Sequence, residues 1–159
     1  MSILFLHCGV GFIMHLENFN SDEFRLWWPE MSPRLLTMLD LLRYGLGSPI
    51  SISKAKGAIG RQDDTESEHN VSKWGEVLAV DCFVSGVYGR AQVESVVDEA
   101  KKLGFTGIGI YPGWSNNRGE KQCGFHLGVR PTRKMGDPAT WGCMNGEFVS
   151  LMKALRAIK

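Results

Sequence analysis

Three side chains of metal-binding type, His69, Asp81 and His126, are the residues of this chain whose chemistry stands out. Asp81 interrupts the apolar run 77–83, where an ionised carboxylate is costly unless it is paired or bound to a cation. Two neutral imidazoles and one carboxylate make a three-ligand zinc site whose fourth position is left for water, which is the catalytic pattern. The sequence therefore predicts a catalytic zinc (Zn2+) site at these residues.

Two of the three residues lie in segments with the pattern of buried strands. In the segment 125–130, apolar residues alternate with His126, Gly128 and Arg130. The two-residue period of a strand therefore places His126 and Arg130 on the face opposite the apolar one. His69 lies in the polar, irregular stretch 60–73, which we expect to be a loop, where functional groups are commonly presented.

Other interpretations of these residues remain open. A histidine is commonly satisfied by backbone hydrogen bonds, and Asp81 can pair with an arginine such as Arg61 or Arg130. Cys123 lies three residues before His126, so these two residues and Cys143 can instead form a small structural zinc cluster. The four cysteines include no CxxC pair, which favours synthesis in a reducing compartment over a disulfide framework.

Length and composition limit the classes of protein to which this chain can belong. The 159 residues are 43% hydrophobic and carry a net charge of +1, which is typical of one globular domain and gives no basic surface for nucleic acid. The apolar stretch 3–14 is too short to span a bilayer, so no stable membrane insertion is expected. We interpret residues 1–13 as an N-terminal extension, with an alternative start at Met14, and residues 14–159 as the domain.

The expected elements are short and mixed. Capping residues and apolar stripes predict a helix over 21–28, a second helix from Pro33 to the glycines 45 and 47, and a third over 90–103. Strands are expected at 49–54, 77–83, 107–111 and 125–130, followed by a loop through Trp141 and a final helix over 147–158. The glycines of 104–109 do not match GxGxxG and no helix follows them, which excludes a dinucleotide fingerprint there.

Five stretches in order carry a resemblance to a known family. They are residues 67–70 (SEHN), 77–81 (VLAVD), 104–112 (GFTGIGIYP), 125–130 (FHLGVR) and 139–142 (ATWG). Together they resemble the zinc D-alanyl-D-alanine carboxypeptidase/endopeptidase family of cell-wall enzymes, in the branch common among bacteriophage proteins. The similarity runs from about residue 14 to residue 141.

This resemblance implies an α+β fold of the Hedgehog/DD-peptidase type, a small, mostly antiparallel sheet with a zinc-binding groove packed against helices. His69 of the S-x-H motif, Asp81 of A-x-D and His126 would be the zinc ligands, and Ser67 would contact substrate. Arg61 would receive a substrate carboxylate or carbonyl, a role that suits a planar bidentate donor. Its alternative role is that of a structural partner of a nearby aspartate.

The activity implied is zinc-dependent hydrolysis of peptide stems or cross-links of bacterial peptidoglycan, by a phage lysis enzyme or a virion-associated lysin. Such a protein would be made in the bacterial cytoplasm and act at the cell wall or periplasm, or be carried in a virion with other phage structural proteins. Arg61 or Arg130 would stabilise the oxyanion. Tyr111 and Trp141 would line the substrate groove.

One departure from the family concerns the last motif. The family often has H-x-D-x-R, whereas this chain has Gly128 at the position of the aspartate. The base would then be Glu76 or Glu68, and Glu76 is the stronger candidate. The same glycine favours an alternative function, a catalytically impaired member of the fold that acts as a cell-wall or tail-protein binding module.

Overall fold

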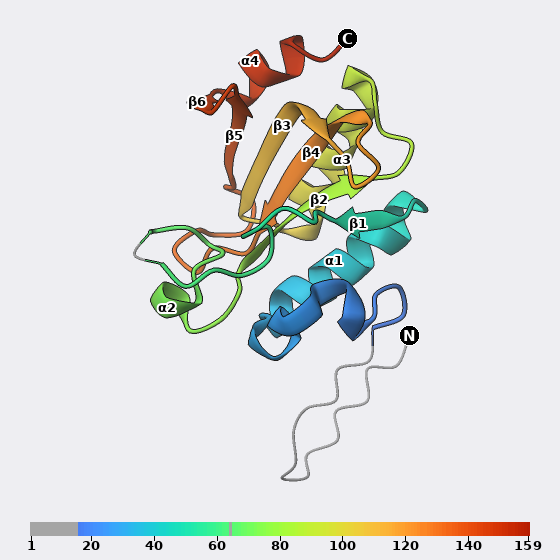
Figure 1. The fold of residues 1–159 in the computed structure, drawn as a ribbon. Helices are drawn as coiled ribbons and strands as arrows, with labels where there is room; N and C mark the ends of the chain where they lie inside the picture. The colour runs from blue at the N-terminus through green and yellow to red at the C-terminus, as the bar shows by residue number, and fades with distance from the viewer. Residues whose placement is uncertain (1–15, 64) are drawn as a thin grey trace, which may run out of the picture.

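The computed structural model describes residues 16–63 and 65–159, so the predicted extension 1–13 and the start at Met14 lie outside the described residues. Its six strands form one sheet in the order β1-β2-β4-β3-β5-β6 (Figure 1). The strands are β1 (Ile50–Ile52), β2 (Ala79–Val84), β3 (Gly107–Ser115), β4 (Lys121–Gly128), β5 (Ala139–Met144) and β6 (Glu147–Val149). All neighbours are antiparallel except β3 and β5, which are parallel. The predicted α+β class with a mostly antiparallel sheet is confirmed.

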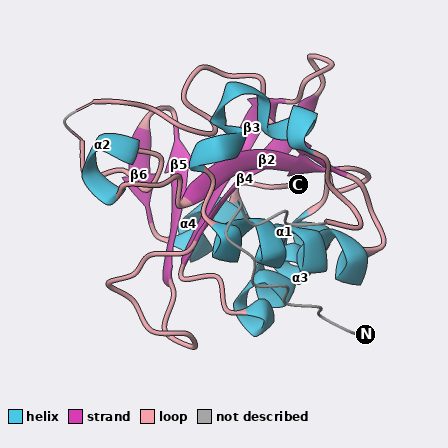
Figure 2. Cartoon of the chain, turned by 90° about the horizontal axis from the view of Figure 1, so that it is seen from below, coloured by secondary structure: helices cyan, strands magenta, loops and turns pink. Residues whose placement is uncertain are grey.

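Three helices pack on one face of this sheet, namely α1 (Pro33–Leu46), α3 (Arg90–Leu103) and α4 (Leu151–Arg156) (Figure 2). The predicted range 90–103 of the third helix is confirmed. α1 begins at Pro33, and its predicted apolar stripe is buried. Gly47 and Gly104 end α1 and α3 with φ of 58° and 91°, a conformation that glycine adopts without steric cost.

The first predicted helix is only partly regular. Residues 21–30 form η1 (Ser21–Glu30), a 3-10 helix broken at Arg25, where φ is 56° and ψ is −139°. Asn20 and Glu23 form a capping box at its start. Arg25 donates a hydrogen bond of 2.7 Å to the carbonyl of Ser53, which ties η1 to the chain just after β1.

The C-terminal part of the chain differs from the prediction. The expected loop through Trp141 is strand β5, and the expected helix over 147–158 begins only at Leu151 because residues 147–149 form β6. Asn145 and Gly146 join the two strands with φ of 53° and 83°. Two consecutive positive φ angles make the tight hairpin turn for which Asn-Gly is favoured. The end of the predicted loop 60–73 is the start of one short helix, α2 (Val71–Trp74).

The two faces of the sheet are chemically distinct. In β4, Cys123, Phe125 and Leu127 belong to the hydrophobic core, so the two-residue period of the strand turns His126 to the opposite face. In β2, Cys82 lies in the core, and its neighbour Asp81 likewise takes the opposite face. The predicted segregation of polar and apolar residues in these strands is confirmed. No helix among the described residues has the length and apolar character to cross a membrane.

Candidate metal centre

The centre is built on a row of residues that face each other across four strands. Asp81 of β2 pairs with His126 of β4, which pairs with Gly109 of β3, which pairs with Trp141 of β5. Directly paired residues on one face have neighbouring side chains. Gly109 has no side chain, and the indole of Trp141 therefore reaches over it towards the His126 ring, at 4.9 Å between ring centroids.

His69 reaches this row from the loop before α2. Its carbonyl accepts a hydrogen bond of 2.9 Å from the Arg61 amide, and its own amide donates to the Ser67 hydroxyl at 3.3 Å. The Asn70 side chain fixes the loop by donating to the carbonyls of Asp63 and Thr65. The predicted site residue Ser67 is thus part of the loop's own hydrogen-bond network, and its contact with substrate stays a prediction.

The structure brings the three predicted ligands together. His69 Nε2, Asp81 Oδ1 and His126 Nδ1 lie 3.1, 3.2 and 3.5 Å apart in the three pairs. Zinc bonds of roughly 2.0 Å in tetrahedral geometry place ligand atoms about 3.3 Å from one another. All three side chains are buried. The spacing of these atoms fits a metal ion of this size.

The hydrogen bonds of the two histidines also fit a cation. His69 Nδ1 lies 2.7 Å from the carbonyl oxygen of Ile59, and His126 Nε2 lies 2.9 Å from Oε2 of Glu68. When a cation binds and both imidazoles are neutral, each acceptor would hold the single ring proton on the outer nitrogen, so both inner nitrogens would present lone pairs. With Asp81 Oδ1, three lone pairs then converge, and they repel unless a proton or a cation lies among them.

In the absence of a cation, charge at the centre is carried by a proton. Burial opposes the charged form of His126, but the hydrogen bonds and charges of Asp81 and Glu68 outweigh it and raise the pKa to about 9. Burial also opposes the charged form of Asp81, and the hydrogen bonds from His126 and His69 nevertheless hold its pKa well below the usual range. The site therefore favours bound positive charge.

Glu68, the weaker of the two candidate bases predicted from the sequence, lies at the centre. It is 2% exposed, its Oε2 contacts His126, and its Oε1 lies 3.1 Å from Arg130 Nε, in ion-pair geometry without hydrogen-bond alignment. The opposing effect of burial is outweighed by His126 and Arg130, which lower the pKa of the carboxyl. Glu76, the favoured candidate base, is partly exposed and forms no hydrogen bond or ion pair with another described residue, so its role stays a prediction.

Two of the predicted groove residues lie beside the ligands. The Tyr111 hydroxyl donates to Asp81 Oδ1 at 3.4 Å, and its ring stacks on Trp114 with centroids 3.9 Å apart. The guanidinium of Arg130 lies 5.9 Å from the centre of the Trp141 ring. Burial, with the charge of Asp81, raises the pKa of Tyr111, so its hydroxyl remains a donor at neutral pH.

Two of the alternative interpretations are wrong. Asp81 contacts the two histidines and Tyr111, not Arg61 or Arg130. Cys123 faces the core, with its thiol pKa raised to about 12 by burial, whereas His126 faces the other way. Among the described residues, the set of side chains placed to hold a metal ion is His69, Asp81 and His126.

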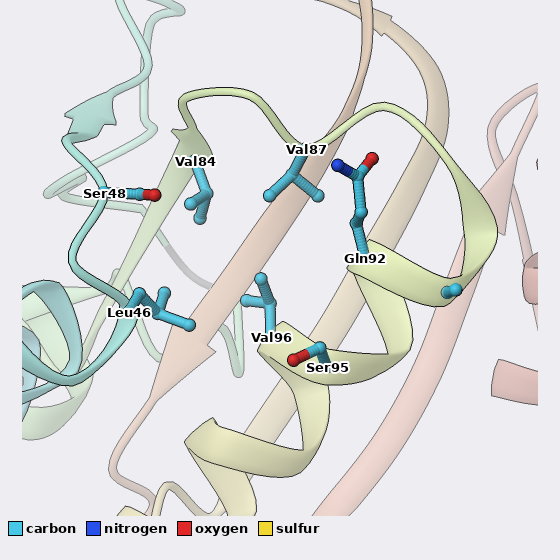
Figure 3. Close-up of a pocket in the computed structure, with 8 residues that line it drawn as sticks. Leu46, Ser48, Val84, Val87, Gln92, Ser95 and Val96 are labelled. Atoms are coloured by element: carbon cyan, nitrogen blue, oxygen red, sulfur yellow. The ribbon is translucent and has the colours of Figure 1, made fainter.

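Two hollows lie outside the ligand group. The larger, of about 710 Å³, is lined by η1 and residues 55–63, including Arg61 and the same Ile59 whose carbonyl contacts His69. Arg61 lies 3.9 Å from Asp63, the structural partner foreseen in its alternative role. The smaller hollow, shown in Figure 3, lies between the end of α1, β2 and α3, and no titratable side chain lines it. The larger hollow therefore lies on the outer side of His69, and none of the three ligands lines it.

Comparisons with known proteins give no match: no family model, no curated protein and no solved structure matches this chain. The resemblance to zinc peptidases thus stays a prediction from motifs.

Proposed function

We propose that this protein is a zinc-dependent peptidase that hydrolyses peptide stems or cross-links of bacterial peptidoglycan, as a phage lysis enzyme or a virion-associated lysin. The observation that carries the proposal is the convergence of three ligand atoms, His69 Nε2, Asp81 Oδ1 and His126 Nδ1, in a buried centre with a three-ligand set. Structural zinc sites take four protein ligands, whereas three ligands leave a position for reaction. The choice of peptidoglycan follows from the motif resemblance.

Zinc bound here would supply Lewis-acid chemistry, polarising an amide carbonyl and making water a stronger nucleophile near neutral pH. The chain's own residues would hold the substrate. Among the described residues, Trp141 Nε1 is buried without an acceptor, and the buried Arg61 Nε has only Asp63 Oδ2 at 3.9 Å, beyond hydrogen-bond distance. Buried donors are normally paired, and an amide carbonyl or carboxylate of a bound peptide would supply the missing acceptors. The Tyr111 hydroxyl donates its single proton to Asp81 and would hold that ligand in place.

The charges that line the larger hollow favour a peptide ligand with acidic groups. Its lining includes Arg25, Lys56 and Arg61 against one carboxylate, that of Asp63. A surface of mainly one sign attracts ligands of the opposite sign. A stem peptide carries carboxylate groups, and we propose that Arg61, at the edge of this hollow, receives one of them.

The first experiment measures the zinc content of the purified, untagged protein by mass spectrometry. The wild-type chain should hold about one zinc, and His126→Ala should hold none. Gln122→Ala is the matched control, because Gln122 is equally buried in the same strand but donates its hydrogen bonds to the backbone carbonyls of Val84 and Val87 and forms none with the three ligands. The absence of zinc from the wild-type protein, even after reconstitution, would refute the proposal.

The second experiment measures new amino groups released from purified sacculi. The zinc-loaded protein should release them, a chelator should stop the release, and added zinc should restore it. Zinc binding without any release would instead support the binding module that Gly128 suggested.

A further inference from the structure

Glu68 is a buried carboxylate that the proposed reaction does not use. It comes from the loop that carries His69, and its backbone carbonyl accepts a hydrogen bond of 2.9 Å from Leu78, just before β2. Both oxygens of its side chain are engaged, Oε2 by His126 and Oε1 by Arg130. A buried carboxylate is costly unless such partners hold it, so its position is specific.

The space that Glu68 occupies exists because of two glycines. Gly107 of β3 and Gly128 of β4 are directly paired in the sheet. A Cβ atom at Gly107 would lie 2.6 Å from Glu68 Oε1, and one at Gly128 would lie 2.8 Å from the same oxygen. Both distances are shorter than side-chain carbons tolerate, so any other residue at either position would displace the carboxylate.

We infer that Glu68 is a positioning residue for the metal centre and that it takes the place of the carboxylate that Gly128 lacks. A side chain at position 128 projects from the same strand face as His126, two residues earlier. The carboxylate of an aspartate there would enter the volume that Glu68 fills from the loop. The chain therefore has one carboxylate beside His126, and that carboxylate comes from the loop before α2 and not from β4.

Glu68 acts through His126. Its carboxylate accepts a hydrogen bond from Nε2–H and thereby fixes Nδ1 as the nitrogen that faces the other ligands. The negative charge of the carboxylate also makes the imidazole a better electron donor. Arg130 forms an ion pair with the second oxygen of the carboxylate. This inference rests on the zinc centre of the proposed function, and it does not depend on peptidase activity.

The test compares the zinc affinity of wild type, Glu68→Ala, Glu68→Gln and the double variant Glu68→Ala/Gly128→Asp. Affinity is measured by competition with a chromophoric chelator, and ligand geometry by the visible absorption spectrum of the cobalt-loaded protein. Glu68→Ala should weaken zinc binding about 10- to 100-fold and change the cobalt spectrum. Glu68→Gln keeps an acceptor without the charge and should lose less. The double variant should regain most of the affinity.

The matched control is Glu66→Gln, two residues earlier on the same loop, whose exposed carboxylate pairs with Lys73 and should leave zinc binding unchanged. If wild type binds zinc and both single variants at Glu68 bind it equally well with the same cobalt spectrum, the inference is overturned while the proposed function stands. If wild type binds no zinc, both fail. If Glu68→Ala does not fold, Glu68→Gln and its cobalt spectrum decide the positioning role. If the single variants lose zinc affinity and a folded double variant does not regain it, the inference that Glu68 replaces a carboxylate at position 128 is overturned.

Discussion

Replacing Gly109 by alanine should displace the Trp141 ring and destabilise the protein. A Cβ atom at this position would lie 2.6 Å from both Cε2 and Nε1 of Trp141. Ordinary van der Waals contact begins at 3.4 Å, so the ring would have to move by about 0.8 Å. The backbone of Gly109 is not in the left-handed region, and the cost is therefore steric.

Overpacking of this kind costs about 1–3 kcal/mol, and the lower entropy of the unfolded alanine chain offsets about 0.4–1 kcal/mol of it. The midpoints of these two ranges leave a net loss of about 1.3 kcal/mol, which corresponds to a fall in Tm of about 3–5 °C for a chain of this size. Thermal and urea unfolding of the metal-free protein measure this loss without a contribution from ligand binding.

A double-mutant cycle tests the cause. In a Trp141→Ala background, the added methyl group meets no ring, so Gly109→Ala should then cost nothing or stabilise slightly. Gly45→Ala in α1 is the control, because its Cβ would meet only the Glu99 carboxylate at 3.4 Å and alanine favours a helix. Equal destabilisation by Gly109→Ala in both backgrounds would refute the assigned contact with Trp141.

Three further predictions concern the metal, the thiols and the hairpin. Free zinc at about 1,000 times its Kd should stabilise the protein by about 4 kcal/mol, so a chelator should lower Tm by roughly 8–16 °C, and His126→Ala should show no such response. At pH 8 the raised pKa of Cys123, about 12, leaves about one thiolate in ten thousand. Peptide mapping after alkylation of the native protein should therefore find Cys143 modified and Cys123 intact. Equal labelling of the two cysteines would contradict the burial of Cys123. Asn145→Ala should cost about 1 kcal/mol in urea unfolding because alanine is strained at φ of 53°, whereas Asn145→Gly should be tolerated.

The helices were predictable where local signals agree. Pro33 opens α1, Gly47 and Gly104 close α1 and α3, and the apolar spacing marks the buried stripe of each helix. These signals act within one turn of the chain, so a single sequence is sufficient to read them. The strand alternation around His126 is a local signal of the same kind.

The C-terminal strands were missed for two different reasons. The Asn145–Gly146 pair is a local hairpin signal that the prediction of a helix from residue 147 overlooked. β5, by contrast, is a strand because it pairs in parallel with β3, which lies before β4 in the sequence. A parallel partner so far along the chain leaves no mark in the segment itself.

In the candidate site, the residue types pointed to the three ligands, and their proximity in space is confirmed. The role of Glu68 was not readable, because it depends on Gly107 and Gly128 lying opposite each other. That pairing is a fact of strand register, which one sequence does not determine. The two glycines on the polar faces of their strands were nevertheless a usable sign that some other group lies over the sheet.

The origin of the ligands in distant segments has a kinetic consequence. His69 and His126 are 57 residues apart, and α3 and β3 lie between the ligand strands β2 and β4. We expect contacts across such separations to form late, together with the pairing of β2 and β4 or after it. A bound ion would then act on the finished protein, slowing its unfolding while leaving the refolding rate almost unchanged. Cells producing this chain could fold it first and load it with metal afterwards.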